Sequence, residues 1–405
     1  MESSTDFDLV IVGAGMVGAT LACAMENSGL RIAVLDTHVP AAFEPSQPHD
    51  LRVSALSIAS QRILENTKVW GGISTRRCCP YRRMRVWETE SRGDTLFDSA
   101  DIDEPVLGHI VENRVIQLAL WERMEQCANL ELFCPVTIGN IEYRGEGSRV
   151  VLEDGRTLSA KLLVGADGGQ SLVRQQAGIG VHNWDYAQHA LVVYVETDYP
   201  QQDITWQKFV PAGPMAFLPL TENHASLVWY NRPAEVKRLL SLPDDAFEAE
   251  LLASFPQDLG KLKRIISRVS FPLKRQHALN YVKPGVALVG DAAHMIHPLA
   301  GQGVNIGLLD AAALAEQLSA AVAEHRDIAS MEVLRQYEQQ RRKHNLSMMT
   351  TMDLFYRIFR SEQLPLKIFR NIGLGLAQKI IPAKNKAMRF AMGLEGPLPA
   401  LAKAK

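Results

Sequence analysis

The sequence lacks the features that mark membrane-spanning, secreted or nucleic-acid-binding chains. Among its 405 residues, 43 Lys and Arg stand against 45 Asp and Glu, so the basic excess typical of nucleic-acid binding is missing. No run approaches the roughly 20 consecutive apolar residues that span a bilayer. Residues 1–6 are acidic, whereas a secretory signal peptide begins with basic residues. We expect a cytoplasmic protein that binds no nucleic acid, with any membrane contact being peripheral, at the inner membrane.

Cysteine is scarce, and its positions suggest neither disulfides nor a metal centre. No C-x-x-C pair occurs, and no Cys/His cluster has the spacing of a zinc site. We therefore expect ordinary thiols in a reducing compartment and no bound metal. The five cysteines are Cys23, Cys78, Cys79, Cys127 and Cys134.

Short apolar runs followed by glycine or aspartate predict the strands of a parallel α/β sheet, with an antiparallel sheet inserted between them. The runs lie near residues 8, 31, 162 and 287, whereas alternating β-rich segments dominate from about 185 to 232. The dinucleotide-binding domain is thus expected to be discontinuous, because the β-rich segment interrupts it. The expected boundaries are 1–75, 105–180 and 275–345 for this domain, 76–104 and 181–274 for a β-rich substrate domain, and 346–405 for a helical C-terminal region.

The first candidate site is a glycine-rich turn between a strand and a helix. Gly13, Gly15 and Gly18 match G-x-G-x-x-G, in which the glycines allow a tight turn, close approach to a pyrophosphate and helix–strand packing. The pyrophosphate would meet the N-terminus of the following helix. Asp36 ends the next strand, 18 residues after Gly18, where a carboxylate can bind a ribose hydroxyl and repel a 2′-phosphate. This pattern favours FAD or NAD over NADP at this turn.

The second candidate site follows the strand at 162–164. Asp167 lies in the segment 165–171, which is rich in glycine, and Arg174 comes shortly after. An aspartate at the carboxyl end of such a strand is in position to face a ligand. Capping of the next helix explains Asp167 equally well at this stage.

The third candidate site follows the strand at 287–289 and makes FAD the better choice of cofactor. Asp291 can accept hydrogen bonds from sugar-like hydroxyls, and the helix expected from Val304 can stabilise the anionic edge of a reduced flavin. NAD has neither a ribityl chain nor such an anion. Gly301 and Gly303 would free the backbone to approach a flat ring.

Together, the three segments resemble the flavoprotein aromatic hydroxylases, the family that includes para-hydroxybenzoate hydroxylase. The resemblance implies an α/β fold: a discontinuous, Rossmann-like FAD-binding domain with an inserted antiparallel β-sheet substrate domain and a helical C-terminal region. It also implies that Arg52 contacts the flavin and that the segment around Asp167 serves FAD and NAD(P)H. By the same resemblance, Gly290 and Asp291 lie at the ribityl chain. The residues that would line the isoalloxazine are Pro298, Gly301, Gly303, Val304 and Asn305. Asn113 stands where many members have arginine, so no flavin role is carried onto it.

Further segments narrow the resemblance to the ubiquinone-biosynthesis hydroxylases. Residues 52–56, 111–113 and 297–305 carry this likeness, and residues 80–83, 184–188 and 225–230 look most like the bacterial demethoxyubiquinone hydroxylases. The implied reaction uses NAD(P)H as co-substrate and O2, and hydroxylates a polyprenylated quinol or phenol through a flavin C4a-hydroperoxide. The resemblance leaves room for contacts with proteins of a ubiquinone-biosynthesis complex and for a homo-oligomer.

Three alternatives stay open on the sequence: hydroxylation at another ring position, hydroxylation of a small soluble phenol, and a flavoprotein scaffold without activity. No catalytic base is assigned, because His189, His294 and His297 qualify by position or type alone. Trp229 and Tyr230 are candidates for the substrate pocket, although ordinary core packing explains strand aromatics better. The basic, apolar stretch 364–394 fits a membrane or partner surface and a core-closing helix about equally.

Overall fold

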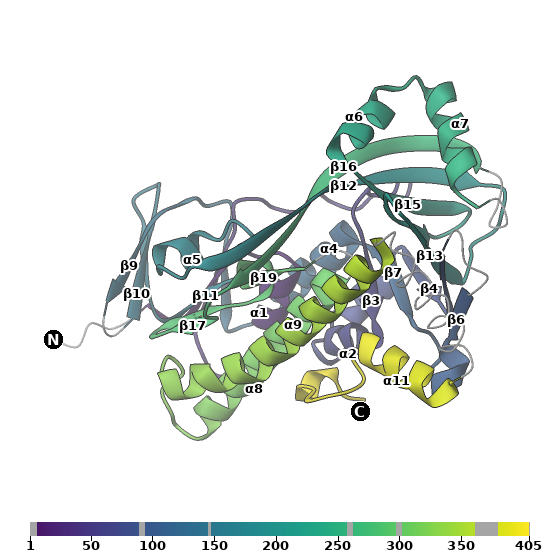
Figure 1. Cartoon of the computed structure of the whole chain (residues 1–405). Coiled ribbons are helices and arrows are strands. Elements are labelled where there is room, and N and C mark those ends of the chain that lie inside the picture. Colours follow the sequence, from purple (N-terminus) through teal and green to yellow (C-terminus); the bar gives the residue numbers. More distant parts are fainter. Residues whose placement is uncertain are drawn as a thin grey trace.

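The computed structural model describes residues 6–88, 94–144, 147–256, 262–296, 302–360 and 380–404. Two large sheets lie at opposite ends of the molecule, and helices fill the space beside and between them (Figure 1). The expected mixed α/β class is confirmed. The domain boundaries drawn from the sequence stay a prediction.

The first sheet has a parallel core built from the predicted apolar strands. Buried residues dominate these strands, as expected where helices cover both faces of a sheet. The order is β17-β18-β11-β1-β2-β8, and β9 and β10 extend it from β11 as antiparallel neighbours. The bounds are β1 Phe7–Val12, β2 Ile32–Leu35, β8 Leu130–Phe133, β9 Ile138–Arg144, β10 Gly147–Leu152, β11 Thr157–Gly165, β17 Val282–Lys283 and β18 Val286–Leu288.

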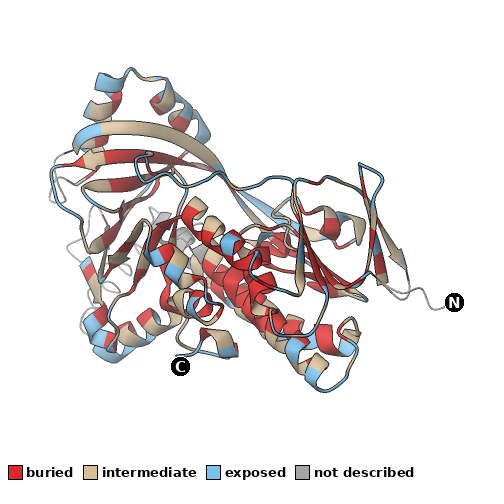
Figure 2. Ribbon diagram, turned by 180° about the vertical axis from the view of Figure 1, so that it is seen from behind, coloured by how far each residue is buried: buried red, intermediate tan, exposed pale blue. Residues whose placement is uncertain are grey.

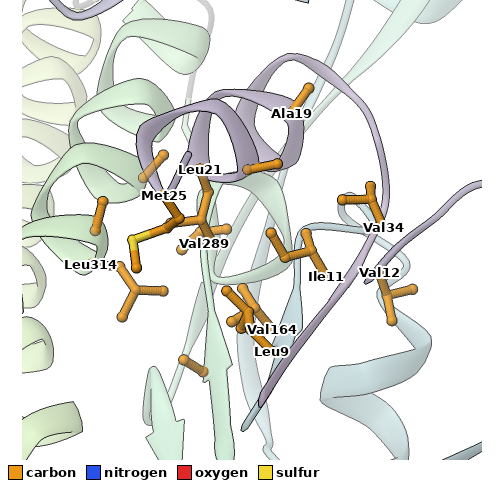
Figure 3. Close-up of a cluster of buried hydrophobic side chains, with 14 of the residues drawn as sticks. Leu9, Ile11, Val12, Ala19, Leu21, Met25, Val34, Val164, Val289 and Leu314 are labelled. Carbon is orange, nitrogen blue, oxygen red and sulfur yellow. The ribbon is translucent and has the colours of Figure 1, made fainter. Parts of the chain in front are cut away.

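Helices pack the first sheet into one large apolar core. Leu9 and Ile11 from β1 meet Leu21 of the first helix and Met25 just after that helix, with Leu314 of the long helix α8 close by (Figure 3). Buried residues dominate the helices beside the first sheet. The two helices over the second sheet, 233–241 and 244–254, expose one face to solvent (Figure 2). The helices of this region are α1 Met16–Ala24, α4 Asn113–Met124, α5 Leu172–Gln176, α8 Gln302–Ala323 and α9 Met331–Arg360.

One helix could span a bilayer by length and composition alone, which the sequence analysis did not anticipate. It covers Gly303–Ala323, with a mean hydropathy of 1.4 in its most apolar window. However, 67% of that window is buried inside the protein, and Asp310 interrupts it. The helix therefore serves as the central core helix of this fold.

The second sheet is mostly antiparallel and occupies the other end of the molecule. Its order is β19-β16-β12-β15-β14-β13-β5-β6, and only β13 and β5 pair in parallel. The 17-residue strands β12 and β16 form a long ribbon that reaches back towards the first sheet (Figure 1). The bounds are β5 Arg83–Glu88, β6 Asp94–Asp98, β12 Val181–Thr197, β13 Ile204–Val210, β14 Gly213–Pro219, β15 His224–Asn231, β16 Leu262–Ala278 and β19 His294–Met295.

The two faces of the second sheet have different neighbours. Two helices, α6 Pro233–Ser241 and α7 Asp244–Ser254, cover an outer face that carries Trp206 and Trp229. The other face, called the inner face below, turns towards the rest of the chain and carries Tyr194. A small sheet of β3 Val53–Ser57, β7 Gly108–Glu112 and β4 Cys78–Tyr81 lies beside it. The other described elements are α2 Ile58–Asn66, α3 Trp70–Ser74, α11 Ile381–Ala391 and the short 3-10 turns Ser99–Ile102, Gly290–Ala292 and Ala400–Ala402.

Candidate cofactor-binding site

The glycine turn after β1 has the shape that its sequence predicts. Gly13 has φ +102°, and a Cβ there would lie 2.5 Å from the carbonyl oxygen of Ala166. A Cβ on Gly18 would lie 2.0 Å from the oxygen of Gly13, so only glycine lets α1 approach the turn. A Cβ on Gly15 would meet nothing within 4 Å. Gly13 and Gly18 are thus required by the chain itself, whereas Gly15 borders open space where a ligand can approach.

Asp36 lies beside this turn, at the end of β2. Its Oδ2 accepts a hydrogen bond from the amide of Ala14 at 2.6 Å, and its Oδ1 accepts one from the amide of His38 at 3.1 Å. Helix α1 begins after Gly15 without a side-chain cap, which leaves its first amides available to an anion. The residues predicted for the adenosine and pyrophosphate groups therefore meet at one point.

Asp167 caps a helix, which was one of its two interpretations. Its Oδ2 accepts hydrogen bonds from the amides of Leu172, at 2.7 Å, and Val173, at 3.1 Å, at the start of α5. Its Oδ1 is buried and has no partner within the described parts of the chain. Desolvation raises the pKa of this carboxyl above its ordinary value. One oxygen is thus structural, and the other is buried without a partner among the described residues.

Arg174 joins the second and third sequence segments. Its Nη2 donates to the carbonyl oxygen of Gly169 at 2.8 Å, and its Nη1 donates to that of Ala292 at 2.9 Å. The side chain is buried. One guanidinium therefore sets the spacing between the turn that carries Asp167 and the turn that carries Asp291.

Asp291 is the accessible carboxylate of the third segment. Its side chain is exposed, and it makes no hydrogen bond or ion pair to any described residue. Desolvation by the surrounding protein nevertheless raises its pKa, although His294 acts in the opposite direction. The carboxyl is therefore surrounded by protein yet reachable by solvent, as a ligand-binding group should be. Beside it, Gly290 has φ +59° and packs against Val17 of α1.

A buried polar network holds this turn from behind. The carboxylate of Asp310 is fully buried and forms a hydrogen bond with Nε2 of His294. It also accepts hydrogen bonds from Nε of Arg341, at 2.8 Å, and from Nδ2 of Asn345, at 3.0 Å. Burial opposes ionisation, but the charges of His294 and Arg341 hold the pKa of Asp310 well below its usual range. The amide of Gly290 also donates to Asp310, at 3.3 Å. His294 thus anchors the turn and has the structural role that was considered beside catalysis.

Asp310, Arg341 and Asn345 were missed by the sequence analysis. They lie in ordinary helical sequence, where a buried ion pair leaves no local pattern. Asn305, in contrast, was predicted, but its side chain has a structural use. Its Nδ2 donates to the oxygen of Ala55 at 2.8 Å, and its Oδ1 accepts from the amide of Ser57 at 2.9 Å.

The remaining predicted flavin residues are only partly described. A Cβ on Gly303 would meet nothing within 4 Å, and Val304 is partly buried against the main core at the start of α8. Pro298, Gly301 and the candidate base His297 lie outside the described residues. Of the residues predicted to line the flavin ring, the structure therefore describes Gly303, Val304 and Asn305.

Arg52 lies where the first part of the chain meets the second sheet. Its guanidinium is 4.6 Å from the ring centroid of Phe271 on β16, and the side chain is exposed. Its carbonyl accepts from the amide of Asn113 at 3.0 Å. Asn113 also receives a 2.6 Å hydrogen bond from Ser54, so its side chain is engaged within the chain.

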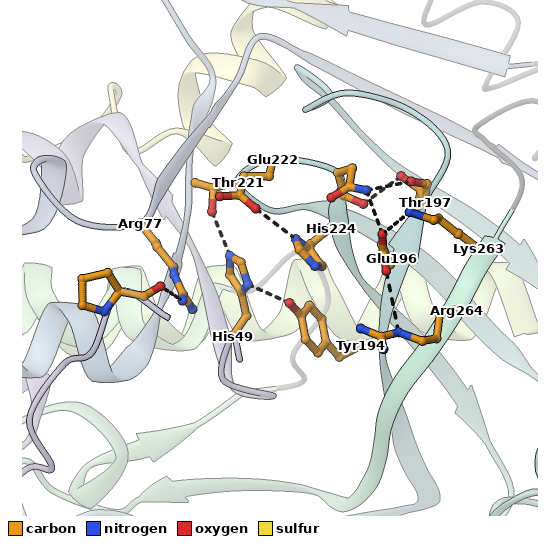
Figure 4. Close-up of polar contacts among 12 residues, drawn as sticks. His49, Arg77, Tyr194, Glu196, Thr197, Thr221, Glu222, His224, Lys263 and Arg264 are labelled. Carbon is orange, nitrogen blue, oxygen red and sulfur yellow. Dashed lines mark hydrogen bonds and ion pairs between the residues drawn. The ribbon is translucent and has the colours of Figure 1, made fainter. Parts of the chain in front are cut away.

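A second polar cluster lies at the same junction (Figure 4). His49 shares hydrogen bonds of 2.8 Å with the hydroxyls of Tyr194 and Thr221. Burial, with the charges of Arg77 and His224, lowers the pKa of His49 to about 3. Burial raises the pKa of Tyr194 to about 12. This neutral cluster connects the segment before Arg52 to β12.

The candidate pocket aromatics on β15 point to opposite faces of the sheet. Trp229 pairs with Leu191 and lies in the outer core under α6 and α7. Tyr230 pairs with Ala190 on the inner face. Position therefore leaves Tyr230 as a candidate and makes Trp229 structural. His189, on β12, is partly buried.

Within the described residues, no group of three or more His, Cys, Asp and Glu could hold a metal ion. All five cysteines are free. The thiol of Cys23 donates to the carbonyl oxygen of Leu120 at 3.8 Å, and the thiol of Cys127 donates to that of Arg123 at 3.3 Å.

Comparison with known proteins places these features in a family. The model of the FAD binding domain matches residues 6–351. The chain is 42% identical over 387 residues to 3-demethoxyubiquinol 3-hydroxylase of Escherichia coli, which covers 96% of this chain and 98% of that protein. It is 39% identical to ubiquinone hydroxylase UbiL of Rhodospirillum rubrum, covering 95% and 89%, and 34% identical to mitochondrial ubiquinone biosynthesis monooxygenase COQ6 of Rattus norvegicus, covering 96% and 92%.

Solved structures share the fold at low sequence identity. p-Nitrophenol 4-monooxygenase PnpA of Pseudomonas putida has a TM-score of 0.78 at 19% identity, covering 98% of this chain and 100% of that one. PqsL of Pseudomonas aeruginosa, a probable FAD-dependent monooxygenase, has a TM-score of 0.75 at 21% identity, covering 91% and 99%.

Proposed function

The chain belongs to the FAD-binding family of aromatic hydroxylases and is an FAD-dependent monooxygenase of the ubiquinone-biosynthesis type, and we propose that it hydroxylates the ring of a polyprenylated ubiquinone precursor. The observation that best supports this proposal is the 42% identity to 3-demethoxyubiquinol 3-hydroxylase over 98% of that protein. NAD(P)H and O2 are the proposed co-substrates. The ring position named for this relative, position 3 of demethoxyubiquinol, is the first candidate for the position that this chain hydroxylates.

The residues of the site fit FAD. The glycine turn leaves open space at Gly15, Asp36 lies beside it, and Asp291 offers an accessible carboxylate. We assign the pyrophosphate to the turn, the adenosine ribose to Asp36 and the ribityl chain to Asp291. Bound FAD would supply the activation of O2 that ring hydroxylation requires. The chain contributes binding, orientation and exclusion of water.

We place the substrate ring at the junction marked by Arg52 and Phe271. Phe271 pairs with Ala190, and Ala190 pairs with Tyr230, so directly opposite side chains put all three on the inner face. The contact between Arg52 and Phe271 brings this face against the segment assigned to the flavin. A ring held there would lie between the two parts of the chain.

We place the polyprenyl tail in an apolar band that continues from the inner face. Phe209 and Val86 on the sheet pack with Met352 of α9. Met352 also packs with Ile296, Ile306 and two further methionines, next to the start of α8. Methionine adapts its shape to irregular apolar partners, which suits a long flexible chain. The residues of this band are Val86, Tyr186, Phe209, Ile296, Ile306, Met348, Met349, Met352 and Phe390.

In the C-terminal region, the residues 380–404 give limited support for a membrane-binding surface. Ile380 and Ile381 are 49% and 57% exposed at the start of α11. However, Lys384 binds Asp101 at 2.8 Å and Arg389 donates to the oxygen of Ile102, so both cations serve packing. Peripheral membrane contact therefore stays a proposal that rests on the two isoleucines, while Lys367, Arg370 and Lys379 lie outside the described residues.

Product analysis in a strain that lacks its own demethoxyubiquinol hydroxylase tests the proposed substrate. Expression of this chain should remove the accumulated demethoxy precursor and restore ubiquinone. A ubiquinone-biosynthesis hydroxylase that acts at another ring position is the second candidate. That alternative predicts restoration in a strain blocked at the other position, with the demethoxy precursor left unchanged.

A further inference from the structure

The peptide groups on both sides of Ala14, in the middle of the glycine turn, are held by side chains. The amide of Ala14 donates to Oδ2 of Asp36 at 2.6 Å. Its carbonyl oxygen accepts from the indole Nε1 of Trp121 at 3.0 Å. Ala14 is completely buried. The turn is therefore fixed by contacts from two other elements, β2 and α4.

Trp121 reaches this turn from far away in the chain. It lies on α4, 107 residues after Ala14, and its ring is buried in the main core, where α4 packs along α1. The neighbouring backbone is fixed as well, because the amide of Gly13 donates to Leu35 at 2.7 Å and that of Ala166 to Val12 at 2.8 Å. Trp121 supplies the hydrogen bond that holds the peptide between Ala14 and Gly15, the residue that precedes α1.

This hydrogen bond determines the direction of one specific amide. The carbonyl of Ala14 and the N–H of Gly15 belong to the same planar, trans peptide, so they point in opposite directions. An indole that holds the carbonyl towards the core therefore turns the Gly15 N–H away from it. That is the residue where a Cβ would meet nothing within 4 Å.

We propose that Trp121 is a positioning residue for the diphosphate of FAD, which it serves by aiming the amide of Gly15 at the cofactor. The proposal rests on the FAD assignment made above and adds a residue outside the glycine motif. It assigns the indole N–H to cofactor affinity, whereas the ring itself fills the core.

The test compares two tryptophan variants of the whole chain. Trp121→Phe removes the N–H donor and keeps an aromatic ring. Trp206→Phe is the matched control, because Trp206 is 1% exposed and its Nε1 has no partner within the described part of the chain. Apoprotein of each variant is titrated with FAD, with ADP and with riboflavin, and its thermal midpoint is measured.

We expect Trp121→Phe to weaken FAD and ADP binding by about fivefold to tenfold, the loss of one hydrogen bond. Riboflavin affinity should stay unchanged because riboflavin has no diphosphate, and Trp206→Phe should bind all three ligands as the parent does. Unchanged FAD and ADP affinity in Trp121→Phe would overturn the proposal, as would an equal loss for riboflavin.

A second variant covers the case in which Trp121→Phe does not fold. Replacement of Trp121 by 3-benzothienylalanine keeps the ring size and exchanges the N–H for sulfur, and the same pattern of affinities is expected. A parent apoprotein that takes up no FAD contradicts the cofactor assignment itself. FAD uptake by the parent with no loss in either variant contradicts the role of Trp121 alone.

Discussion

Arg174 and Ala292 are 118 residues apart, and the guanidinium of the first donates to the carbonyl of the second at 2.9 Å. Through Gly169, the same side chain also holds the turn that carries Asp167. The buried guanidinium of Arg174 thus joins two of the predicted cofactor segments, the one that carries Asp167 and the one that carries Asp291. This side chain adds to the backbone hydrogen bond from Val289 to Gly165, at 3.0 Å, which joins the same two segments where their strands end.

Removal of this connection should weaken cofactor binding and stability together. Arg174→Met leaves the carbonyls of Gly169 and Ala292 without their donor, and we expect the free energy of unfolding to fall by about 2–4 kcal/mol. FAD affinity should fall as well, since the turns that carry Asp167 and Asp291 are released. Gln175→Ala, an exposed change on the same helix, is the control. Wild-type FAD affinity in Arg174→Met would contradict the role of this connection.

The glycine turn allows stability to be separated from cofactor binding. Gly18→Ala places a Cβ 2.0 Å from the oxygen of Gly13, so we expect a loss of about 3 kcal/mol or more in urea unfolding of the apoprotein. Gly15→Ala meets no atom of the chain within 4 Å and should unfold like the parent. Its Cβ occupies the proposed path of the diphosphate, so FAD affinity should fall about tenfold. Equal stability of the two variants would contradict this assignment.

The buried histidines predict a loss of stability in mild acid. Burial, with the charge of His294 next in importance, lowers the pKa of His277 from 6.5 to about 4. The unfolded chain therefore binds a proton on this histidine below about pH 6.5, whereas the folded chain does not until about pH 4. Stability from this group is complete above pH 6.5 and falls as the pH drops through that window, by about 2 kcal/mol at pH 5.

His277→Gln should reduce this acid sensitivity. Urea unfolding between pH 7 and pH 5 measures the slope, and the exposed His325→Asn variant should keep the parent's slope. A parent protein whose free energy of unfolding does not change across this interval would show that His277 titrates normally.

The apolar band around Met352 predicts a selective effect on the substrate tail. Met352→Lys places a charge among Val86, Phe209 and Tyr186, and we expect KM for a polyprenylated quinol to rise about tenfold. KM for the same ring without a tail should change little. Leu354→Lys, at an exposed position two residues later, is the control. An equal rise for both substrates would place the tail elsewhere.

Local patterns in the sequence predicted the parts of the site that depend on local geometry. The strand, glycine turn and helix around Gly13 are encoded within a few residues, and so is the turn at Gly290. The contacts that join these parts could not be predicted in this way. Nothing in the local sequence distinguishes Trp121, Asp310 and Arg341 from other helix residues. Their roles depend on contacts that exist only in the folded chain.

The same distinction explains the ambiguous cases. Asp167 had a capping and a ligand interpretation, and the structure uses one carboxylate oxygen for the cap while the other has no described partner. Trp229 and Tyr230 could be separated only once the strand had a defined outer and inner face. A single sequence reports the period of a strand, but it does not say which face meets which neighbour.

The central claim is that this chain, loaded with FAD, inserts oxygen from O2 into the ring of a polyprenylated quinol. The direct test supplies the purified, FAD-loaded protein with NAD(P)H, a polyprenylated demethoxyquinol and isotopically labelled O2, and follows the product by mass spectrometry. The account predicts a product that carries one labelled oxygen atom on the ring. Recovery of unchanged quinol, or of a product whose new oxygen is unlabelled, would contradict it.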